Sequence, residues 1–237
     1  MISFSIDVDW VNDFVLEDTL KVFEENEIKC TIFTTHKTTV LSSLNSDLFE
    51  IGLHPNFNKL LNRDAKKSAK KLLHELKNNY PDSIGIRSHS LVNSTYLSNL
   101  FVEIGMKYES NILLPYQKLI KPFQLWNGLY RTSFNWEDDI HFMYKKSFDS
   151  LGLDMLNEDI VFNFHPIHVF INSENTNRYN RIKDNYHDTD ILKKNINYSE
   201  VKGTRDLMLD CIRKIKKNGI KTTTLKERFK DIINDEI

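Results

Sequence analysis

The segment that decides the fold is ISFSIDVDWVNDFVLEDTLKVFEENEIKCTIFT, residues 2–34. It begins with an apolar, β-prone run over Ile2–Val8, continues with apolar residues at helical spacing over Phe14–Glu25, and ends in a β-branched run over Ile28–Thr34. A strand, a helix and a second strand in this order predict a βαβ unit, in which the two strands pair in parallel.

The same alternation of element types continues along the chain. Further strands are predicted at Leu48–Leu53, Ser83–Ile86, Met106–Glu109, Val161–Phe164 and Ile220–Thr223. Further helices are predicted at Asp64–Asn78, Ser94–Ile104, Thr204–Lys217 and Leu225–Ile233. Strands separated by helices of about ten to fifteen residues predict an α/β fold built on a parallel sheet.

Two regions depart from this alternation. Leu113–Phe142 is aromatic and irregular, and Asn172–Gly203 is polar and rich in asparagine. The second region is too long for an ordinary connection, which favours a mobile lid or a partly disordered insertion at about 172–203. Because no internal repeat and no Pro/Gly-rich linker interrupts the sequence, we expect a single domain over residues 1–237.

The composition excludes several classes of protein. The 237 residues hold 32 Lys+Arg and 33 Asp+Glu, a net charge of −1, so the chain lacks the strongly basic character of a nucleic-acid-binding or polybasic membrane-surface protein. Two cysteines, Cys30 and Cys211, are too few for a disulfide framework or a Cys-rich zinc site. Without a transmembrane-length apolar run or a signal-peptide pattern, we expect a cytoplasmic protein; nothing in the sequence indicates an oligomeric state.

Polar residues follow four of the predicted strands. They are Asp7-Val8-Asp9, the run from His54 to Asn58, Arg87-Ser88-His89 and His165-Pro166-Ile167-His168. Taken singly, each has a structural alternative as a helix cap, a buried histidine or a turn. Because ligands of parallel α/β folds bind at the carboxyl ends of the strands, the four together favour one functional site.

The residue types in these motifs point to a divalent metal ion. Aspartate and histidine are ligands that suit Zn²⁺ and similar ions. Asp7 and Asp9 leave opposite faces of a regular strand and converge only if the chain bends there. His54 and Asn58 share a face if their segment forms a helical turn. Because Asn58 is a weak neutral ligand, His89 is the natural candidate for a third ligand, and the sequence leaves these two as alternatives.

The order of these motifs resembles the polysaccharide deacetylase family, carbohydrate esterase family 4, with its NodB homology domain. The matching blocks are Asp7-Val8-Asp9, Glu50 to Asn58, Arg87-Ser88-His89, Trp136-Glu137-Asp138-Asp139 and Phe164-His165-Pro166. The second block departs from the family pattern His-x-x-x-His, because Asn58 replaces its second histidine. The runs His-Pro-Asn-Phe, Arg-Ser-His-Ser and Gly203-Thr204-Arg205-Asp206 resemble the intracellular WbmS-like branch. The resemblance implies an irregular (β/α)7 barrel.

The resemblance also implies a metal-dependent mechanism. The metal ion, with Zn²⁺ first and Co, Ni, Mn or Fe as alternatives, would be held by Asp9, His54 and either His89 or Asn58. The catalytic roles would fall to Asp7 as general base, Arg87 orienting it, His165 as general acid, and Asp138 or Asp139 orienting His165.

The implied activity is removal of an N-acetyl group from a sugar or glycan precursor, nucleotide-linked or lipid-linked, in surface-polysaccharide biosynthesis. Trp10, Trp136 and His168 are the residues we expect to bind the substrate, while Tyr116, Trp126 and Tyr130 either stack on sugar or fill the barrel mouth. Two alternatives stay open. One is a degenerate member that binds sugar or metal without turnover because Asn58 weakens the site, and the other is a hydrolase of a non-sugar amide.

Overall fold

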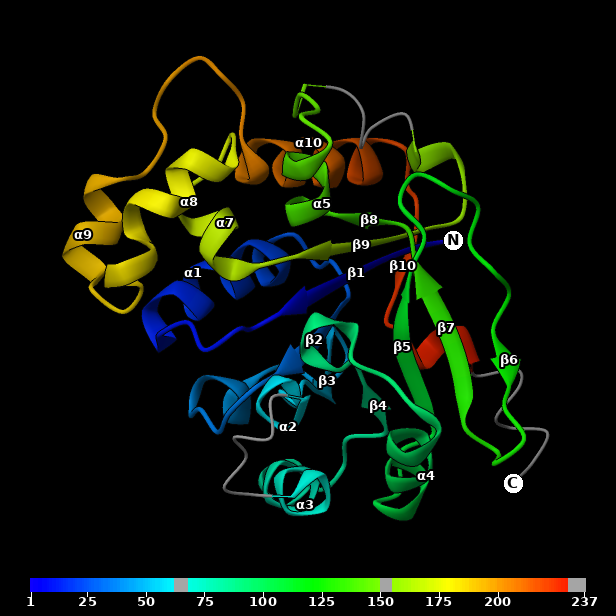
Figure 1. The fold of residues 1–237 in the computed structure, drawn as a ribbon. Coiled ribbons are helices and arrows are strands. Elements are labelled where there is room, and N and C mark those ends of the chain that lie inside the picture. The colour runs from blue at the N-terminus through cyan, green and yellow to red at the C-terminus, as the bar shows by residue number, and fades with distance from the viewer. Residues whose placement is uncertain (62–67, 150–154, 230–237) are drawn as a thin grey trace.

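A computed structural model of the chain describes residues 1–61, 68–149 and 155–229. Its centre is a sheet with strand order β6-β7-β5-β4-β3-β2-β1-β9-β8, and β10 also pairs with β1 (Figure 1). The strands are β1 (Ile2–Asp7), β2 (Cys30–Thr34), β3 (Phe49–Leu53), β4 (Gly85–Ile86), β5 (Tyr108–Leu113), β6 (Phe123–Gln124), β7 (Tyr130–Phe134), β8 (Trp136–Glu137), β9 (Ile160–Phe164) and β10 (Thr222–Thr223). Every recorded pairing is parallel except that of β6 with β7, which confirms the predicted α/β class.

Helices surround this sheet (Figure 1). The α-helices are α1 (Asp13–Glu25), α2 (Asn58–Leu61), α3 (Ala69–Asn79), α4 (Thr95–Glu103), α5 (Asp138–Met143), α7 (Pro166–Phe170), α8 (Thr176–Ile182), α9 (Thr189–Lys194) and α10 (Thr204–Lys217). The 3₁₀ turns are η1 (Val40–Ser43), η2 (His89–Leu91), η3 (Met155–Asn157), η4 (Lys183–Asn185) and η5 (Lys226–Phe229). None of the described helices is both long and apolar enough to cross a membrane.

The first strand shows why the sequence folds this way. Every residue of β1 is buried, because β1 lies between neighbouring strands and is covered on both faces. The ring of Phe4 packs against Phe23 of α1, with centroids 5.5 Å apart, and against Phe162 of β9 at 5.3 Å. Asn12 caps α1 by accepting a hydrogen bond from the backbone N–H of Val15 at 3.0 Å.

The two ends of the sheet meet at a single residue. β7 and β8 lie near opposite ends of the strand order, yet only Asn135 separates them along the chain. The backbone N–H of Asn135 donates to the carbonyl of Val161 at 3.3 Å, and the N–H of Val161 donates to the side-chain oxygen of Asn135 at 3.0 Å. The sheet therefore curls round on itself, and Asn135 joins its ends in place of a ladder between β7 and β8.

The structure differs from the expected elements at four places. The helix expected over Asp64–Asn78 begins at Ala69, and residues 62–67 lie outside the described part. Of the helix expected over Leu225–Ile233, the described part is the short turn η5. The region 113–142 contains β6, β7, β8 and α5, which the sequence did not predict. The region 172–203 contains α8, η4 and α9 in place of an irregular loop.

Candidate functional site

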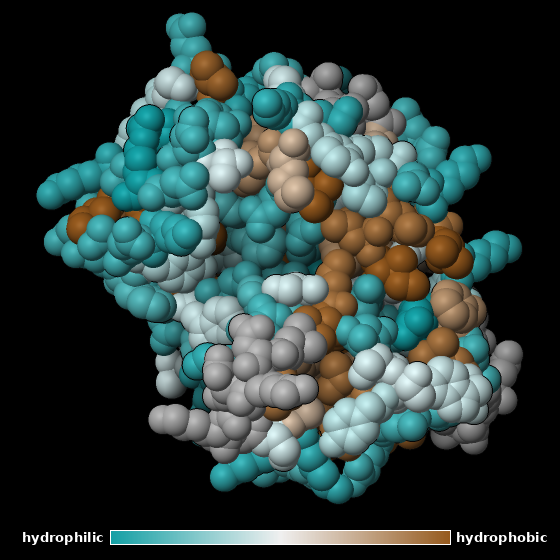
Figure 2. Space-filling view, viewed as in Figure 1, coloured by the Kyte–Doolittle hydropathy of each residue, from teal (hydrophilic) through white to brown (hydrophobic). Residues whose placement is uncertain are grey.

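The polar residues that follow the strands converge on one hollow. Figure 2 shows this hollow near the centre of the molecule, with hydrophilic surface at its floor. It corresponds to a cavity of about 510 Å³ that is lined from the strand ends by Asp9, His89 and His165. A larger cavity of about 940 Å³, bordered by Lys29 and Glu50, contains none of the predicted site residues.

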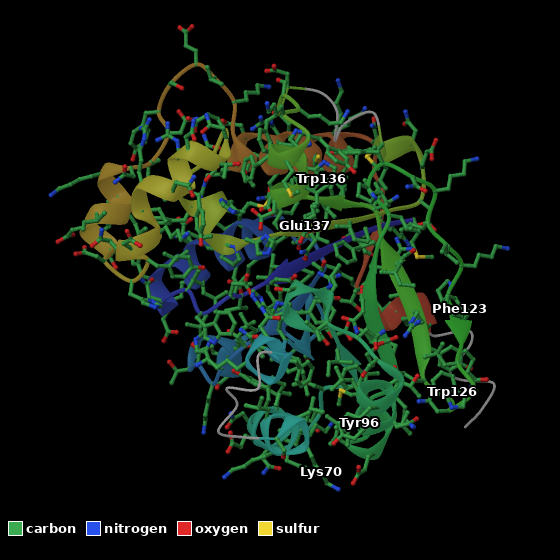
Figure 3. All side chains as sticks on the ribbon, viewed as in Figure 1. Lys70, Tyr96, Phe123, Trp126, Trp136 and Glu137 are labelled. Atoms are coloured by element: carbon green, nitrogen blue, oxygen red, sulfur yellow. The ribbon has the colours of Figure 1, made fainter. Side chains whose placement is uncertain are left out.

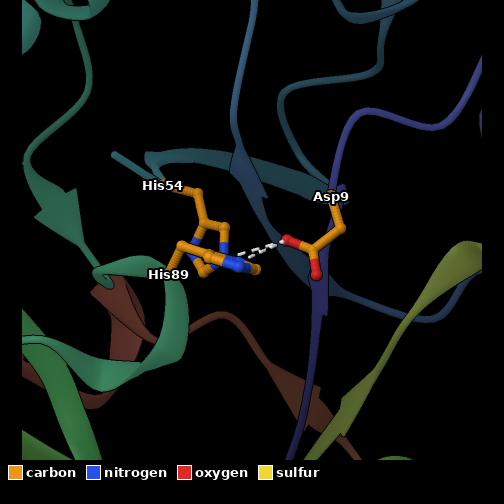
Figure 4. A group of neighbouring side chains, drawn as sticks. All are labelled: Asp9, His54 and His89. Atoms are coloured by element: carbon orange, nitrogen blue, oxygen red, sulfur yellow. Dashed lines mark hydrogen bonds and ion pairs between the residues drawn. The ribbon is translucent and has the colours of Figure 1, made fainter. Parts of the chain in front are cut away.

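The chain bends at the end of β1, as convergence of the two aspartates requires. Asp9 and Trp10 have φ values of 44° and 60°, in the left-handed region that few residues other than glycine adopt. The bend brings Asp9 Oδ1 to 3.2 Å from His54 Nε2 and 3.1 Å from His89 Nδ1, as Figure 4 shows. The donor atoms of these three residues all lie within 4.8 Å of one another.

The hydrogen bonding of His54 fits a bound cation. His54 Nδ1 lies 2.7 Å from the backbone carbonyl oxygen of Arg87, which can only accept, so the proton belongs on Nδ1. Nε2 then presents a lone pair to the Asp9 carboxylate, and that contact needs a cation or a second proton between the two atoms. One oxygen and two nitrogen donors, with Asp9 and His89 lining the cavity, match a three-ligand catalytic metal site.

The electrostatics of Asp9 agree with this arrangement. Burial alone would raise the pKa of the Asp9 carboxyl, but the adjacent His54 and His89 rings and the charge of His165 lower it well below its usual range. Asp9 is therefore anionic, as a metal ligand must be.

His89 and Asn58, the two candidates for the third ligand, have different hydrogen-bond partners. His89 contacts Asp9 directly, whereas the side-chain amide of Asn58 donates to the hydroxyl of Ser90 at 3.2 Å. Asn58 stands at the start of α2 and is partly exposed. Of the two, His89 is the one that forms a candidate donor group with Asp9 and His54; Asp7, Glu137 and His165 form a second group of neighbouring donors.

Asp7 is held in a buried hydrogen-bond network beside this group. The guanidinium of Arg87 donates to Asp7 Oδ1 at 3.0 Å, and the amide of Asn163 donates to Asp7 Oδ2 at 3.0 Å. Arg87 is fully buried, with its guanidinium between the rings of Phe33 and Phe134 at 4.4 and 4.0 Å from their centroids. Asp7 therefore has a fixed orientation at the floor of the site.

His165 is oriented by Asp138, one of the two carboxylates that the sequence left open. His165 Nδ1 lies 2.6 Å from Asp138 Oδ1, and the backbone N–H of His165 donates to Asp138 Oδ2 at 2.8 Å. His165 Nε2 lies 3.7 Å from Asp9 Oδ2. Burial alone would lower the pKa of His165, but Asp138, Asp139 and Asp9 raise it well above its ordinary value. Nδ1 therefore carries a proton, and the imidazolium form is favoured.

The expected substrate-binding residues lie in different environments. Trp10 is 37% exposed, lines the cavity and contacts the ring of His89 edge-on at 5.1 Å. His168 also lines the cavity and is held by Asp139 at 3.0 Å and by Ser173 at 3.1 Å. Trp136, in contrast, is fully buried and packs on Phe162 and Phe164, so its ring fills the core and offers no face to a sugar.

Glu137 lies beside the site, although none of the roles expected from the sequence falls to it. Its side chain comes from β8, near the centre of the molecule (Figure 3). Glu137 Oε1 is 4.0 Å from His165 Nε2 and accepts from Asn163 at 3.4 Å. Burial raises the pKa of Glu137 to about 7, with Asp7 and Asp138 adding to the rise and His165 opposing it. Glu137 pairs with Asn163 in the register of β8 against β9, and this register places the Glu137 side chain next to His165.

The region 172–203 forms one wall of the cavity. Tyr179 comes from α8, Lys183 from η4, and Tyr186 and His187 follow directly. Lys183 is exposed and makes no ion pair among the residues that the structure describes. This wall adds a cation and aromatic rings to the site. They come from α8, η4 and the residues that follow, so the pattern of polar residues after strands does not indicate them.

Comparison with known proteins gives a family match over most of the chain. The model of WbmS-like polysaccharide deacetylases matches residues 4–183. A structure from Bordetella bronchiseptica, assigned as a polysaccharide deacetylase involved in O-antigen biosynthesis (WbmS), is 32% identical, with a TM-score of 0.82 and 90% of each chain covered. No curated protein matches the chain.

Two more distant structures are similar in fold alone. One is assigned as a polysaccharide deacetylase from Mycobacterium smegmatis, with 16% identity, a TM-score of 0.51, and 94% of this chain and 92% of that chain covered. The other is a 4-α-glucanotransferase from Thermococcus litoralis, with 14% identity, a TM-score of 0.55, and 98% of this chain and 38% of that chain covered. With the Bordetella structure, these likenesses confirm the predicted fold, the irregular (β/α)7 barrel of NodB-type deacetylases.

Proposed function

Because the chain belongs to the WbmS-like family of polysaccharide deacetylases, we propose that it removes an N-acetyl group from a sugar by metal-assisted hydrolysis of the amide bond. One observation carries the proposal: the Asp9–His54–His89 donor group lies beside an oriented aspartate, Asp7, and an oriented histidine, His165. Amide hydrolysis needs a group that generates hydroxide from water and an acid that protonates the departing amine. The donor group with Asp7 would supply the first, and His165 would supply the second.

Asp9, His54 and His89 would hold a divalent ion, and we propose Zn²⁺ because this donor set is typical of catalytic zinc. When bound, such an ion polarises the amide carbonyl and lowers the pKa of water. Asn58 is not needed for three ligands, which favours an active enzyme over the degenerate alternative.

Asp7 acts as the general base in this proposal. Its two oxygens accept hydrogen bonds from Arg87 and Asn163, which hold the carboxylate in one orientation while leaving lone pairs free. Asp7 Oδ2 lies 3.9 Å from His54 Nε2, so the base stands beside the metal ligands. A proton taken from the attacking water therefore moves to a preorganised carboxylate.

His165 acts as the general acid. An amine is a poor leaving group until it is protonated, so a proton donor must face the nitrogen of the scissile bond. Asp138 holds one proton on Nδ1 and favours the imidazolium form, which leaves the Nε2 proton for the amine. After this transfer His165 is neutral, with its remaining proton on Nδ1 beside Asp138, and it takes up a new proton on Nε2 before the next turnover.

The cavity wall favours a phosphate-linked sugar as the substrate. Lys183 supplies an exposed cation at the cavity, suited to a phosphate of a nucleotide-linked or lipid-linked sugar, and Trp10 offers an exposed ring for a sugar face. The Bordetella relative is assigned to O-antigen biosynthesis. We therefore propose a role in surface-polysaccharide biosynthesis, in the cytoplasm, for a single domain whose region 172–203 covers the site.

Acetate release tests this proposal. Protein stripped of metal with a chelator is incubated with N-acetylated nucleotide sugars, with and without added Zn²⁺ or Co²⁺. We expect acetate only with metal and only from the protein with Asp7 intact. Sugar binding without acetate release would favour the degenerate alternative, and acetate release from simple non-sugar amides alone would favour the third class.

A further inference from the structure

We infer that Tyr186 is a positioning residue of the proposed metal centre, because its hydroxyl holds the bent turn that aims Asp9 at His54 and His89. This inference rests on the proposed function. It assigns to region 172–203 a part in building the site, beyond covering it.

The turn that carries Asp9 has an unfavourable backbone conformation. Asp9 and Trp10 are consecutive residues with positive φ, and tryptophan adopts this region rarely because its side chain crowds the following carbonyl. Such a conformation persists only where surrounding contacts hold it. The contacts that hold this turn therefore determine where the Asp9 carboxylate points.

Region 172–203 provides one of these contacts directly. The hydroxyl of Tyr186 donates to the backbone carbonyl of Asp9 at 2.9 Å, across 177 positions of sequence. The backbone N–H of Trp10 donates to the hydroxyl of Thr35 at 3.1 Å, and that of Val11 to the carbonyl of Val8 at 3.1 Å. The Asp9 carbonyl and the Trp10 N–H belong to one peptide group, so Tyr186 and Thr35 hold the peptide that follows Asp9 from its two sides, and Tyr186 is the partner that region 172–203 supplies.

A second link from the same region lies close by. The side-chain amide of Asn12 donates to the backbone carbonyl of His187 at 3.3 Å, so residues 186 and 187 contact the turn at both of its ends. The ring of Tyr186 lies edge-on to His187 with centroids 5.4 Å apart, which limits the movement of its hydroxyl. The region after α8 is thus fastened to residues 9–12.

Removal of the hydroxyl separates this role from simple contact with a substrate. Tyr186→Phe keeps the aromatic ring in the cavity wall and removes only the hydrogen bond to Asp9. Tyr179→Phe is the matched control, because Tyr179 also lines the cavity and its hydroxyl makes no hydrogen bond within the described residues. Each variant loses one tyrosine hydroxyl from the same cavity wall.

The experiment measures metal affinity without substrate. Zn²⁺ binding is determined by competition with a chromophoric chelator, and the visible absorption of the Co²⁺-loaded protein reports the ligand geometry. We expect Tyr186→Phe to bind Zn²⁺ about three- to tenfold more weakly and to change the Co²⁺ spectrum, because a net hydrogen bond is lost. Tyr179→Phe should match the unaltered protein in both measurements.

The outcomes separate the inference from the function on which it rests. Equal Zn²⁺ affinity and equal Co²⁺ spectra for Tyr186→Phe and the unaltered protein would overturn the inference while leaving the proposed function standing. An unaltered protein that binds neither ion would overturn both. Thermal unfolding of the metal-free variants checks folding, and a weaker affinity in a variant of unchanged melting temperature supports the inference.

Discussion

His54 donates a hydrogen bond from Nδ1 to the backbone carbonyl of Arg87 at 2.7 Å, while the side chain of Arg87 donates to Asp7. One residue therefore positions a candidate metal ligand through its main chain and a candidate base through its guanidinium. The spacing between the two functions is set by the covalent geometry of Arg87. Changes to the base and to the ligands should accordingly have separable effects.

Asp7→Asn should lower kcat by about 10²–10⁴ and leave the metal content unchanged, because Asp7 is outside the donor group of Asp9, His54 and His89. Acetate release and elemental analysis of the same sample measure the two effects. His54→Ala is the contrasting variant and should lose the metal. Loss of metal from Asp7→Asn would instead make Asp7 a ligand.

His89→Ala should weaken metal binding strongly, whereas Asn58→Ala should leave it unchanged. The reason is that His89 contacts Asp9 at 3.1 Å while the Asn58 amide is bonded to Ser90. Loss of an outer-shell partner alone weakens metal binding about 10- to 100-fold, so removal of one of three ligands should weaken it by at least about tenfold. Competition with a chelator measures both constants, and the reverse ranking would make Asn58 the third ligand.

Asp138→Asn should lower kcat by about 10²–10⁴ with metal retained, because His165 loses the carboxylate that holds its Nδ1 proton. The pH profile gives a second readout. Asp138 raises the pKa of His165, so its removal lowers that pKa, and the loss of activity at alkaline pH should begin at a lower pH. An alkaline limb that does not move would mean that another group supplies the proton.

Glu137→Gln should make the stability of the metal-free protein less dependent on pH. The pKa of this carboxyl is about 7 when folded, above its usual 4.5, so the folded chain binds the proton more tightly. Its favourable contribution is complete below pH 4.5 and is lost as the pH rises through 7. Between pH 4.5 and 8, the free energy of unfolding of the unaltered protein should therefore fall by up to about 3 kcal/mol more than that of the variant. Denaturant titration at each pH measures both values.

The exposed Glu17→Gln is the control for that measurement and should keep the pH dependence of the unaltered protein. If Glu137→Gln keeps it as well, Glu137 does not remain buried and uncompensated in the folded chain.

Lys183→Ala should raise KM about three- to tenfold for a phosphate-linked N-acetyl sugar and leave KM unchanged for the same sugar without phosphate, since only the first carries the anion that Lys183 would contact. Lys194→Ala, on α9, is the matched control and should alter neither value. Equal changes for both substrates would exclude a phosphate contact.

The sequence was sufficient to bring together most residues of the candidate site because these residues directly follow strands. Asp9, His54 and His165 each stand within two residues of a strand end, and parallel strands bring such ends together. Glu137 was not found because its place beside His165 depends on the register of β8 against β9, a pairing of residues 26 positions apart. The choice between Asp138 and Asp139 likewise depends on the direction of each side chain in the first turn of α5.

Two other expectations went beyond what local sequence can decide. Trp136 precedes a run of acidic residues, but strand alternation turns its side chain to the core and that of Glu137 to the site. In the region 172–203, Asn175 and Asp188 cap α8 and α9 by accepting backbone N–H bonds. An asparagine-rich composition suggests a loop, although the same residue types also begin helices.

The pairing of β1 has a consequence for the order in which a growing chain is assembled. β2 and β3 leave the ribosome soon after β1, but β9 and β10, which complete the pairing of β1, are made much later. Asp9, His54 and His89 all belong to the first 89 residues, whereas His165 arrives only with β9. A nascent chain can therefore bring the segments that carry Asp9, His54 and His89 together before His165 is made, but the hydrogen bond that holds the Asp9 turn forms only after Tyr186 has followed.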